Sequence, residues 1–541
     1  MPAQKIFVNA RVFTNAHDAQ FEECMVVRGD KIAYVGSRAS APILEIDEIL
    51  DLNGKIVTPA FIDSHCHFLS FGMSLQKLDL SECRSLDEIR QSISTYAKSR
   101  RDLPRLLCRG WQQSSTSGKA LASMIDDLDG RPVFIEALDL HSTWCNSAAL
   151  KEVDAEKIKV ALPNDVQCDG KGSPTGLLAE GAQVSFVWPH LMAVSSEAAK
   201  FAALESAVEE YKRAGYTGFI DMAMDKTVWN TLSKYRAQKG LPFHIAAHWF
   251  IPPGINEEKV EEYLQEAISM HEKHNPLQYP DFCITGIKLM ADGVVDGCTA
   301  SLSHPYGQPG SHVNVKPFWP NALLHHAVQT AAKAGLQVAI HAIGDQAISQ
   351  AVAAIASAGT PHARHRIEHL ELASAEDAAA LAELGITASI QPVHSDPAIL
   401  KDYRNLIGEK SWSRAFPYNE FSKTNIAIGT DAPTARHYAL PNLYNATTRK
   451  SATDRTITEC TTPHYALDLN QALIAATEGA AYSRNAEGWI GSLREGLRAD
   501  FVVLDAEWAP ETLLEAKVLQ TWSRGEIIFD IANDVEAKRG Q

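Results

Sequence analysis

The chain has 541 residues, of which 45% are hydrophobic and 21% are charged, and its formal net charge is −16 at pH 7. This composition supports a large core and excludes a disordered chain, and the negative charge argues against nucleic acid or an anionic membrane as the main partner. The length allows roughly three or four domains, or one barrel of about 250 residues or more with an accessory domain.

The nine cysteines are scattered and form no CxxC pair, which argues against a zinc ribbon. Their odd number, together with an N-terminus that has no signal-peptide pattern, fits a reducing compartment. The longest apolar runs are far shorter than the ~20 residues of a membrane span. We therefore expect a soluble, cytoplasmic protein with no nucleic-acid or membrane partner.

Both ends of the chain have the pattern of short strands separated by turns. Residues 1–54 contain KIFVNARVF and CMVVRGDKIAYVG, and the C-terminal part contains RADFVVLD and VLQTWSRGEIIFD. Two incomplete β pieces around a long α/β middle predict one small β-sandwich built from both termini, over 1–57 and 486–541. Two unrelated β additions are the alternative.

The middle of the chain alternates strand-like and helix-like segments, the pattern of a parallel α/β sheet. Eight strands are expected, at 55–65, 218–223, 243–250, 284–291, 336–341, 364–369, 386–394 and 425–431. We therefore predict a (β/α)8 barrel over 58–485. Residues of about 80–194 are expected to form an inserted subdomain over the barrel mouth, and 292–318 a functional lid or binding loop.

Five of these strands end in residues that can bind a divalent metal. They are His65 and His67 on the first strand, then Lys288, His341, His369 and Asp431. Side chains two apart on a strand share one side, and a parallel barrel gathers its strand ends at one mouth. Each residue alone is more often structural, but the combination predicts a metal-dependent hydrolase. Imidazole and carboxylate ligands suit zinc best, with iron, manganese or nickel as alternatives.

Several motifs closely resemble the amidohydrolase superfamily, and more narrowly the branch of large amidohydrolases that includes N-substituted formamide deformylase. The matching stretches include TPAFIDSHCH, LDLHSTWCNSAAL, SPTGLLAE, GIKLMADG, HAIGDQA, RHRIEHLE, QPVHSD, GTDAP and GSLREGLRADFVVLD. The resemblance covers nearly the whole chain. It implies a barrel, a terminal β-sandwich and a hydrolytic centre with one or two metal ions.

The resemblance also implies a role for each matching residue. His65, His67 and Asp431 would bind the more buried ion, and His341 with His369 the second. A free ammonium has no lone pair for a metal, so Lys288 would be carboxylated and bridge two ions as a carbamate. An unmodified Lys288 beside a single metal is the alternative. Asp63, just before the first ligands, is expected to support them.

The expected mechanism uses metal-activated hydroxide, because zinc lowers the pKa of bound water toward ~7. Asp431 would act as base and pass the proton to the leaving amine. His394 would donate a hydrogen bond to the substrate oxygen, or else be a structural residue at the mouth.

By the same resemblance, Trp111, His141 and Trp144 line the substrate site. Asp292 is expected to position the lid or to be an ordinary turn aspartate. Cys298 stands where close relatives carry an arginine, which favours a less anionic or differently shaped substrate.

The leading interpretation is therefore a hydrolase of a non-peptide C–N bond in an N-acyl or N-formyl amine, a cyclic amide or a related small amide. A deaminase or esterase on the same metal barrel is one alternative, and a catalytically inactive scaffold is another. The resemblance leaves a homodimer open.

Overall fold

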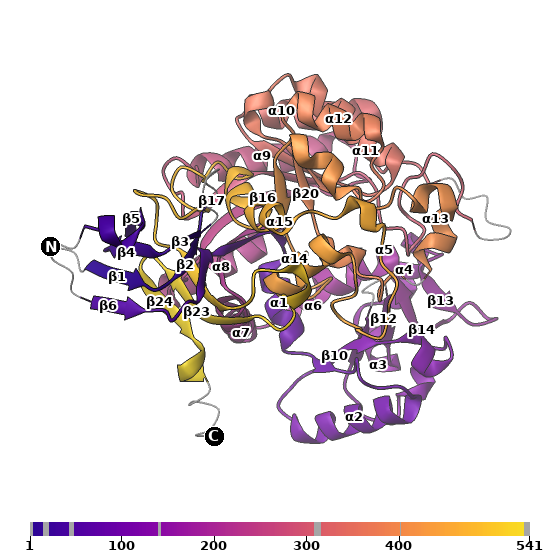
Figure 1. Ribbon diagram of the computed structural model, residues 1–541. Helices are drawn as coiled ribbons and strands as arrows, with labels where there is room; N and C mark the ends of the chain where they lie inside the picture. The colour runs from indigo at the N-terminus through magenta and orange to yellow at the C-terminus, as the bar shows by residue number, and fades with distance from the viewer. Residues whose placement is uncertain are drawn as a thin grey trace. The chain divides into compact units, whose positions relative to one another are not determined.

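Four sheets organise the fold in the computed structural model, which describes residues 4–14, 21–42, 48–138, 142–307, 315–400 and 402–534 (Figure 1). The chain divides into two units. One contains Met1–Phe68 together with Val208–Gln541, and the other contains Leu69–Ala207. None of the helices in the described ranges has both the length and the apolar character that a membrane crossing needs.

The largest sheet has eight parallel strands, in the order in which they follow one another along the chain. They are β8 (Phe61–Cys66), β15 (Tyr216–Met224), β16 (His244–Phe250), β17 (Phe282–Met290), β18 (Gln337–Ala342), β19 (Arg366–His369), β20 (Thr387–Ile390) and β21 (Ile426–Ile428). Just beyond β21, the backbone N–H groups of Thr430 and Asp431 donate to the carbonyl of His65, at 3.2 and 2.7 Å. The sheet is thus a nearly closed barrel, and the predicted α/β barrel architecture is confirmed.

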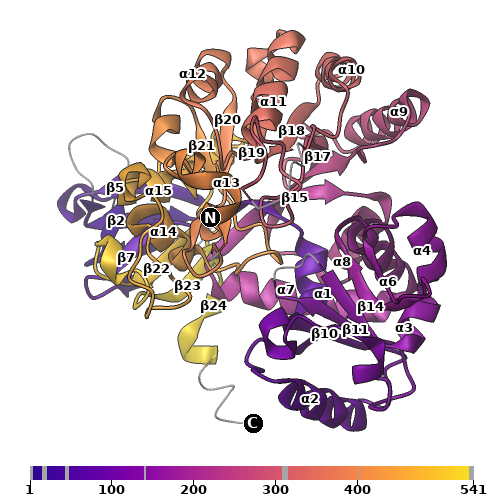
Figure 2. The same cartoon turned by 90° about the vertical axis from the view of Figure 1, so that its right-hand side faces the viewer.

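Helices lie between and after the barrel strands along the chain, and α9 to α12 lie outside β17 to β20 in Figure 2. They are α7 (Glu197–Arg213), α8 (Lys226–Lys239), α9 (Glu257–Lys273), α10 (Asn321–Lys333), α11 (Asp345–Ala358), α12 (Ala375–Leu384), α13 (Tyr403–Trp412), α14 (Ala439–Thr448), α15 (Leu469–Ala475) and α16 (Glu478–Tyr482). Several begin at a side-chain cap: Asp225, Asn256 and Ser374 each accept a hydrogen bond from a backbone N–H of the first turn of α8, α9 and α12.

Two expected strands have different limits in the structure. The stretch 55–65 is two strands, since β7 (Ile56–Pro59) pairs with strands of another sheet and only β8 enters the barrel. The stretch 386–394 ends as a strand at Ile390, and Pro392–Ser395 form a 3-10 helix that carries His394. A proline has no N–H for a strand ladder, so Pro59 and Pro392 both favour a break.

The two ends of the chain meet in one sheet. Its six strands run in the order β24 (Glu526–Asp530), β23 (Lys517–Ser523), β22 (Phe501–Asp505), β7, β2 (Arg11–Phe13) and β3 (Phe21–Glu22). A second sheet contains β5 (Lys31–Gly36), β4 (Cys24–Arg28), β1 (Gln4–Val8) and β6 (Glu48–Asp51). Phe7 and Met25 of this sheet share one hydrophobic cluster with Phe501 and Trp522 of the other. A β-sandwich domain with the bounds 1–57 and 486–541 stays a prediction.

The unit Leu69–Ala207 has its own six-stranded sheet and its own hydrophobic cluster. The strand order is β13 (Val166–Cys168), β14 (Pro174–Ala179), β12 (Ser142–Cys145), β11 (Val133–Ala137), β10 (Leu106–Trp111) and β9 (Leu78–Asp79). The longest helix that lies entirely within this unit is α2 (Leu86–Ser99), which begins at the Ser85 cap. The expected insertion at about 80–194 falls inside this unit, while its position over the barrel mouth stays a prediction.

Candidate metal centre

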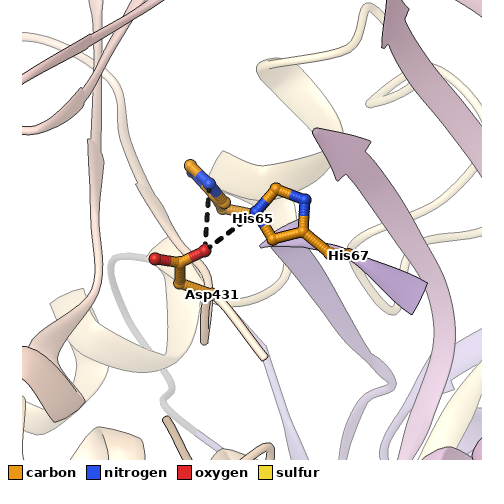
Figure 3. A group of neighbouring side chains, drawn as sticks. All are labelled: His65, His67 and Asp431. Carbon is orange, nitrogen blue, oxygen red and sulfur yellow. Dashed lines mark ion pairs between the residues drawn. The ribbon is translucent and has the colours of Figure 1, made fainter. Parts of the chain in front are cut away.

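Three of the predicted ligands meet where β8 and β21 end. Nε2 of His65 lies 3.4 Å from Oδ1 of Asp431, and Nε2 of His67 lies 3.2 Å from the same oxygen (Figure 3). The ligand atoms of the three residues all lie within 4.8 Å of one another. Asp431 is 364 positions or more from the two histidines in the sequence, yet its carboxylate meets both imidazoles at one point. Two imidazoles and a carboxylate are the kind of ligand set that binds zinc.

The other ring nitrogen of each histidine has a hydrogen-bond partner. Nδ1 of His65 lies 2.7 Å from Oε2 of Glu368, and Nδ1 of His67 lies 2.6 Å from the carbonyl oxygen of Met222. Arg366 in turn donates to both oxygens of Glu368, at 2.6 and 3.0 Å. Such partners fix the tautomer and the orientation of a ligand histidine. Both Nε2 atoms are therefore held toward Asp431.

Asp63 joins the two strands that carry the trio. Its Oδ1 accepts from the backbone N–H groups of His65 and Thr430, at 3.2 and 2.9 Å. Its Oδ2 accepts from the hydroxyls of Thr430 and Tyr211, at 2.6 and 2.9 Å. Four hydrogen bonds to one buried carboxylate fix the end of β21 beside β8, so Asp63 places Asp431 next to the histidines.

A second group of ligand-type side chains lies beside the trio. The ring centroids of His341 and His369 are 4.4 Å apart, and those of His65 and His369 are 5.0 Å apart. His369 and His394 form a further possible ligand group with Asp431, again with ligand atoms within 4.8 Å of one another. Nε2 of His341 lies 3.0 Å from the carbonyl of Gly293, which leaves its Nδ1 for another partner.

The protonation states in the cluster suit metal binding. Burial lowers the pKa of Lys288 to about 8 and that of His341 to about 3, and it holds the pKa of His369 well below its ordinary value. Burial alone would raise the pKa of Asp431, but the neighbouring His65 and His67 outweigh it and hold that pKa well below its usual range. Metals bind neutral imidazoles and ionised carboxylates, and these forms are favoured at His341, His369 and Asp431. At His67 burial opposes protonation, but Asp431 outweighs it and raises the pKa of the imidazole.

Two buried nitrogens at the cluster have no hydrogen-bond partner among the described residues: Nζ of Lys288 and Nδ1 of His369. Lys288 is only 3% exposed and His369 only 4%. A buried polar atom without a partner is costly. A metal ion would satisfy Nδ1 of His369, and carboxylation would remove the buried charge of Lys288. The residues present therefore fit a divalent metal.

The loop after β17 holds two of the residues predicted to bind substrate. Asp292 is fully buried and accepts hydrogen bonds from three backbone N–H groups, those of Ser301, Ile343 and Gly344. Its carboxylate fastens this loop to the end of β18, with Oδ1 3.6 Å from Nε2 of His341. Cys298 lies in the same loop, half-buried, with φ of 53°. Substrate contact by either residue stays a prediction.

Trp111 and Trp144 are core side chains of the unit Leu69–Ala207. They are 1% and 0% exposed, their ring centroids are 5.3 Å apart, and Nε1 of Trp144 donates to the carbonyl of Leu121 at 3.0 Å. This burial gives no support to the expectation that they line the substrate site, which remains untested. His141 lies outside the described residues.

Asp63 was expected to support the ligands, whereas Glu368 and Glu371 were not predicted from the sequence. Glu368 and Glu371 flank His369 within RHRIEHLE, and the only available signal was two acidic residues at the end of a buried strand. Glu371 pairs with His394, whose Nδ1 lies 3.7 Å from its Oε1. Burial opposes protonation of His394, but Glu371 and Asp431 outweigh it and raise the pKa of the imidazole.

Comparisons with known proteins give matches that span most of the chain. The model of the amidohydrolase family matches residues 48–529. Protein LONG AFTER FAR-RED 3 of Arabidopsis thaliana is 27% identical over 97% of this chain and 92% of its own length. N-substituted formamide deformylase of Arthrobacter pascens is 24% identical over 97% of this chain and 98% of its own length.

Among solved structures, an uncharacterized metal-dependent hydrolase from Pyrococcus horikoshii has the same fold. Its TM-score is 0.77 at 22% identity, and the match covers 97% of this chain and 100% of that one. The resemblance inferred from the motifs is thereby confirmed over most of the chain. The chain belongs to the amidohydrolase family and is a hydrolase acting on C–N bonds.

Proposed function

We propose that this amidohydrolase uses one or two divalent metal ions, with zinc the best chemical match, to hydrolyse a non-peptide amide bond in a small molecule. The observation that carries the proposal is the trio of His65, His67 and Asp431. Both histidines direct Nε2 to one carboxylate oxygen, while Glu368 and the Met222 carbonyl hold the opposite nitrogens. Buried, oriented imidazoles beside an ionised carboxylate are typical of a metal site.

His65, His67 and Asp431 would hold the first ion, and His341 with His369 the second. Lys288 fits a carbamate, because its buried amine has no partner among the described side chains and carboxylation would give it two oxygen ligands. Two observations leave the second site less defined than the first. Nε2 of His341 faces a carbonyl, and His394 also lies within ligand distance of His369 and Asp431.

A divalent metal bound here supplies a Lewis acid and favours deprotonation of water near neutral pH. The chain itself would handle the protons. Oδ1 of Asp431 faces the two ligand histidines, whereas Oδ2 lies 3.7 Å from Nε2 of His394. We infer that Asp431 takes a proton from the attacking water at Oδ2 and returns it to the leaving amine. Nε2 of His394 would donate a hydrogen bond to the substrate oxygen as negative charge develops there.

N-formyl and N-acyl amines are the substrates to try first. A relative that matches nearly the whole chain is named as a deformylase of N-substituted formamides. Cys298 is a small thiol in the loop that Asp292 fastens beside His341, so it offers no cation for a carboxylate of the substrate. This supports a neutral or cationic substrate.

The test is a substrate panel for the purified full chain: N-cyclohexylformamide, N-cyclohexylacetamide, a cyclic amide, an aminated aromatic ring and an ester. Released amine, acid and ammonia are measured separately, before and after chelation and zinc reloading. The proposal expects equimolar amine and acid from an amide, lost on chelation and restored by zinc. Ammonia alone would indicate a deaminase, acid from the ester alone an esterase, and no turnover at full metal content an inactive scaffold.

His326 offers a matched control for the ligand histidines. It is 44% exposed on α10 and pairs with Glu261 on α9, at 3.2 Å. His65→Gln and His67→Gln should lose metal and activity, while His326→Gln should keep both. Equal loss in all three variants would mean that the effect does not come from the proposed ligands.

A further inference from the structure

The carboxylate of Glu371 lies next to Nδ1 of His394, whereas Asp431 lies next to Nε2 of the same ring. Oε1 of Glu371 is 3.7 Å from Nδ1 of His394, and Nε2 of the same ring is 3.7 Å from Oδ2 of Asp431. The imidazole thus lies between two carboxylates. Asp431, one of the predicted metal ligands, faces Nε2, and Glu371 faces Nδ1. Glu371 itself is 6% exposed.

Glu371 is held rigidly in this place. Its Oε2 accepts a hydrogen bond of 2.6 Å from the hydroxyl of Tyr403, the buried first residue of α13. Its backbone carbonyl accepts a hydrogen bond of 2.6 Å from the N–H of Phe416. The two carboxylate oxygens therefore face different partners, since Oε2 accepts from the Tyr403 hydroxyl while Oε1 faces His394.

The backbone before Glu371 adopts an uncommon conformation. His369 and Leu370 are consecutive non-glycine residues with φ of 75° and 55°. Positive φ costs such residues energy and persists where the surrounding structure enforces it, often at functional sites. With this backbone conformation, one short segment places His369 in the cluster of ligand-type side chains and Glu371 beside Nδ1 of His394.

The same segment repeats an arrangement seen at the first ligand. Glu368 faces Nδ1 of His65 at 2.7 Å and is fixed by Arg366, as Glu371 faces Nδ1 of His394 and is fixed by Tyr403. A carboxylate at Nδ1 keeps that nitrogen protonated and orients the ring, so that Nε2 points away from the carboxylate. At His394 a second carboxylate, that of Asp431, faces Nε2, so this geometry also accommodates a proton on Nε2. The two acids are thus comparable supports for two different histidines.

We propose that Glu371, anchored by Tyr403, is a positioning residue that sets the orientation of His394 and keeps its Nδ1 protonated. The inference rests on the proposed function, in which His394 acts on substrate through Nε2. Glu371 does not touch the reacting atoms; it acts only through the imidazole.

Glu371→Gln is the sharpest variant, because glutamine keeps the shape but has one acceptor oxygen where Glu371 has two. Either Tyr403 or His394 then loses its acceptor. We expect kcat on N-cyclohexylformamide to fall about 10–100-fold, with KM changed by less than about 3-fold. Tyr403→Phe removes the hydrogen bond to Oε2 but leaves Oε1 of Glu371 at His394, so it should lower kcat by less than about 10-fold. Glu261→Gln, which breaks the exposed Glu261–His326 pair, is the matched control and should change nothing.

A double-mutant cycle separates positioning from a general structural effect. If Glu371 acts through His394, Glu371→Gln should lower kcat by no more than about 2-fold in a His394→Gln background. If the loss of kcat in the double variant equals the product of the losses in the two single variants, the proposal is overturned. Metal content is measured for each protein, because loss of metal in Glu371→Gln with unchanged NMR signals of His394 would likewise overturn it.

A spectroscopic measurement keeps the inference testable whatever the substrate. In ¹⁵N-histidine NMR, the signal missing in His394→Gln identifies His394, and its chemical shifts report which ring nitrogens carry a proton. We expect a protonated Nδ1 in the wild type and a less protonated Nδ1 in Glu371→Gln. Identical His394 signals in the two proteins would overturn the inference even if the enzyme is active. The expected shift in a protein that cleaves no amide would uphold it while the proposed substrate class fails.

Discussion

The variant Glu368→Gln tests whether Glu368 holds the predicted ligand His65 in place. Glu368 and Arg366 are both fully buried, and their ion pair has contacts of 2.6 and 3.0 Å. Removing one partner from a buried pair leaves an uncompensated charge, which costs about 3–5 kcal/mol in the free energy of unfolding. The same change takes the carboxylate away from Nδ1 of His65, and loss of such a partner weakens metal binding about 10–100-fold. One substitution should therefore lower both stability and metal affinity.

The matched control is Glu487→Gln. Glu487 also accepts two hydrogen bonds from an arginine, Arg364, at 2.8 and 2.9 Å, but the two side chains are 30% and 21% exposed. A more exposed pair contributes about 1 kcal/mol or less. Urea unfolding followed by circular dichroism, and zinc titration of the chelated protein, would compare both variants with the wild type. Equal midpoints for the two variants, or unchanged zinc affinity in Glu368→Gln, would show that Glu368 does not support the ligand in this way.

Three further predictions concern the centre and the fold. Asp431→Asn should lower kcat about 10²–10⁴-fold, as expected for loss of a general base, measured by amine release on the best amide of the panel. With ¹³C-bicarbonate the wild type should show a carbamate carbon in ¹³C NMR that Lys288→Met lacks, whereas a signal present in both proteins would exclude Lys288 as its source. Asp500 is buried, and burial is the main reason that its pKa is raised to about 6. Between about pH 4 and 6 the folded state therefore binds more protons than the unfolded state. Because of this difference, the contribution of Asp500 to the free energy of unfolding falls as pH rises. Urea midpoints measured across that range should depend less on pH in Asp500→Asn, and an unchanged slope would contradict the assignment.

The sequence was sufficient for the barrel because strand-like apolar runs alternate with helix-like segments. Five of these runs end in residues that can bind a metal, and that placement predicted the ligand set, since parallel strands direct their carboxyl ends to one face. Lys288, His341 and His369 were predicted separately from single strands, and the structure brings them to one cluster.

Asp63 was expected as a support of the ligands, but Glu368 and Glu371 could not be predicted, because their roles depend on contacts made only in the folded chain. Glu368 meets His65 across 303 residues, and only the barrel, which contains both β8 and β19, makes it a partner of that histidine. Glu371 reaches His394 after two consecutive residues with positive φ, a conformation that the sequence HLE does not predict. The expected strand at 55–65 ran through Pro59, and the change of sheet there depends on pairing with β22 near the C-terminus.

The most direct test of the proposed metal centre measures the metal content of the purified chain by elemental analysis and its amide hydrolysis in the same sample. We predict at least one tightly bound divalent ion in the wild type and in His326→Gln, and loss of that ion together with hydrolysis in His65→Gln. A wild-type chain that hydrolyses its amide at full rate while containing essentially no divalent metal would contradict the metal-dependent mechanism.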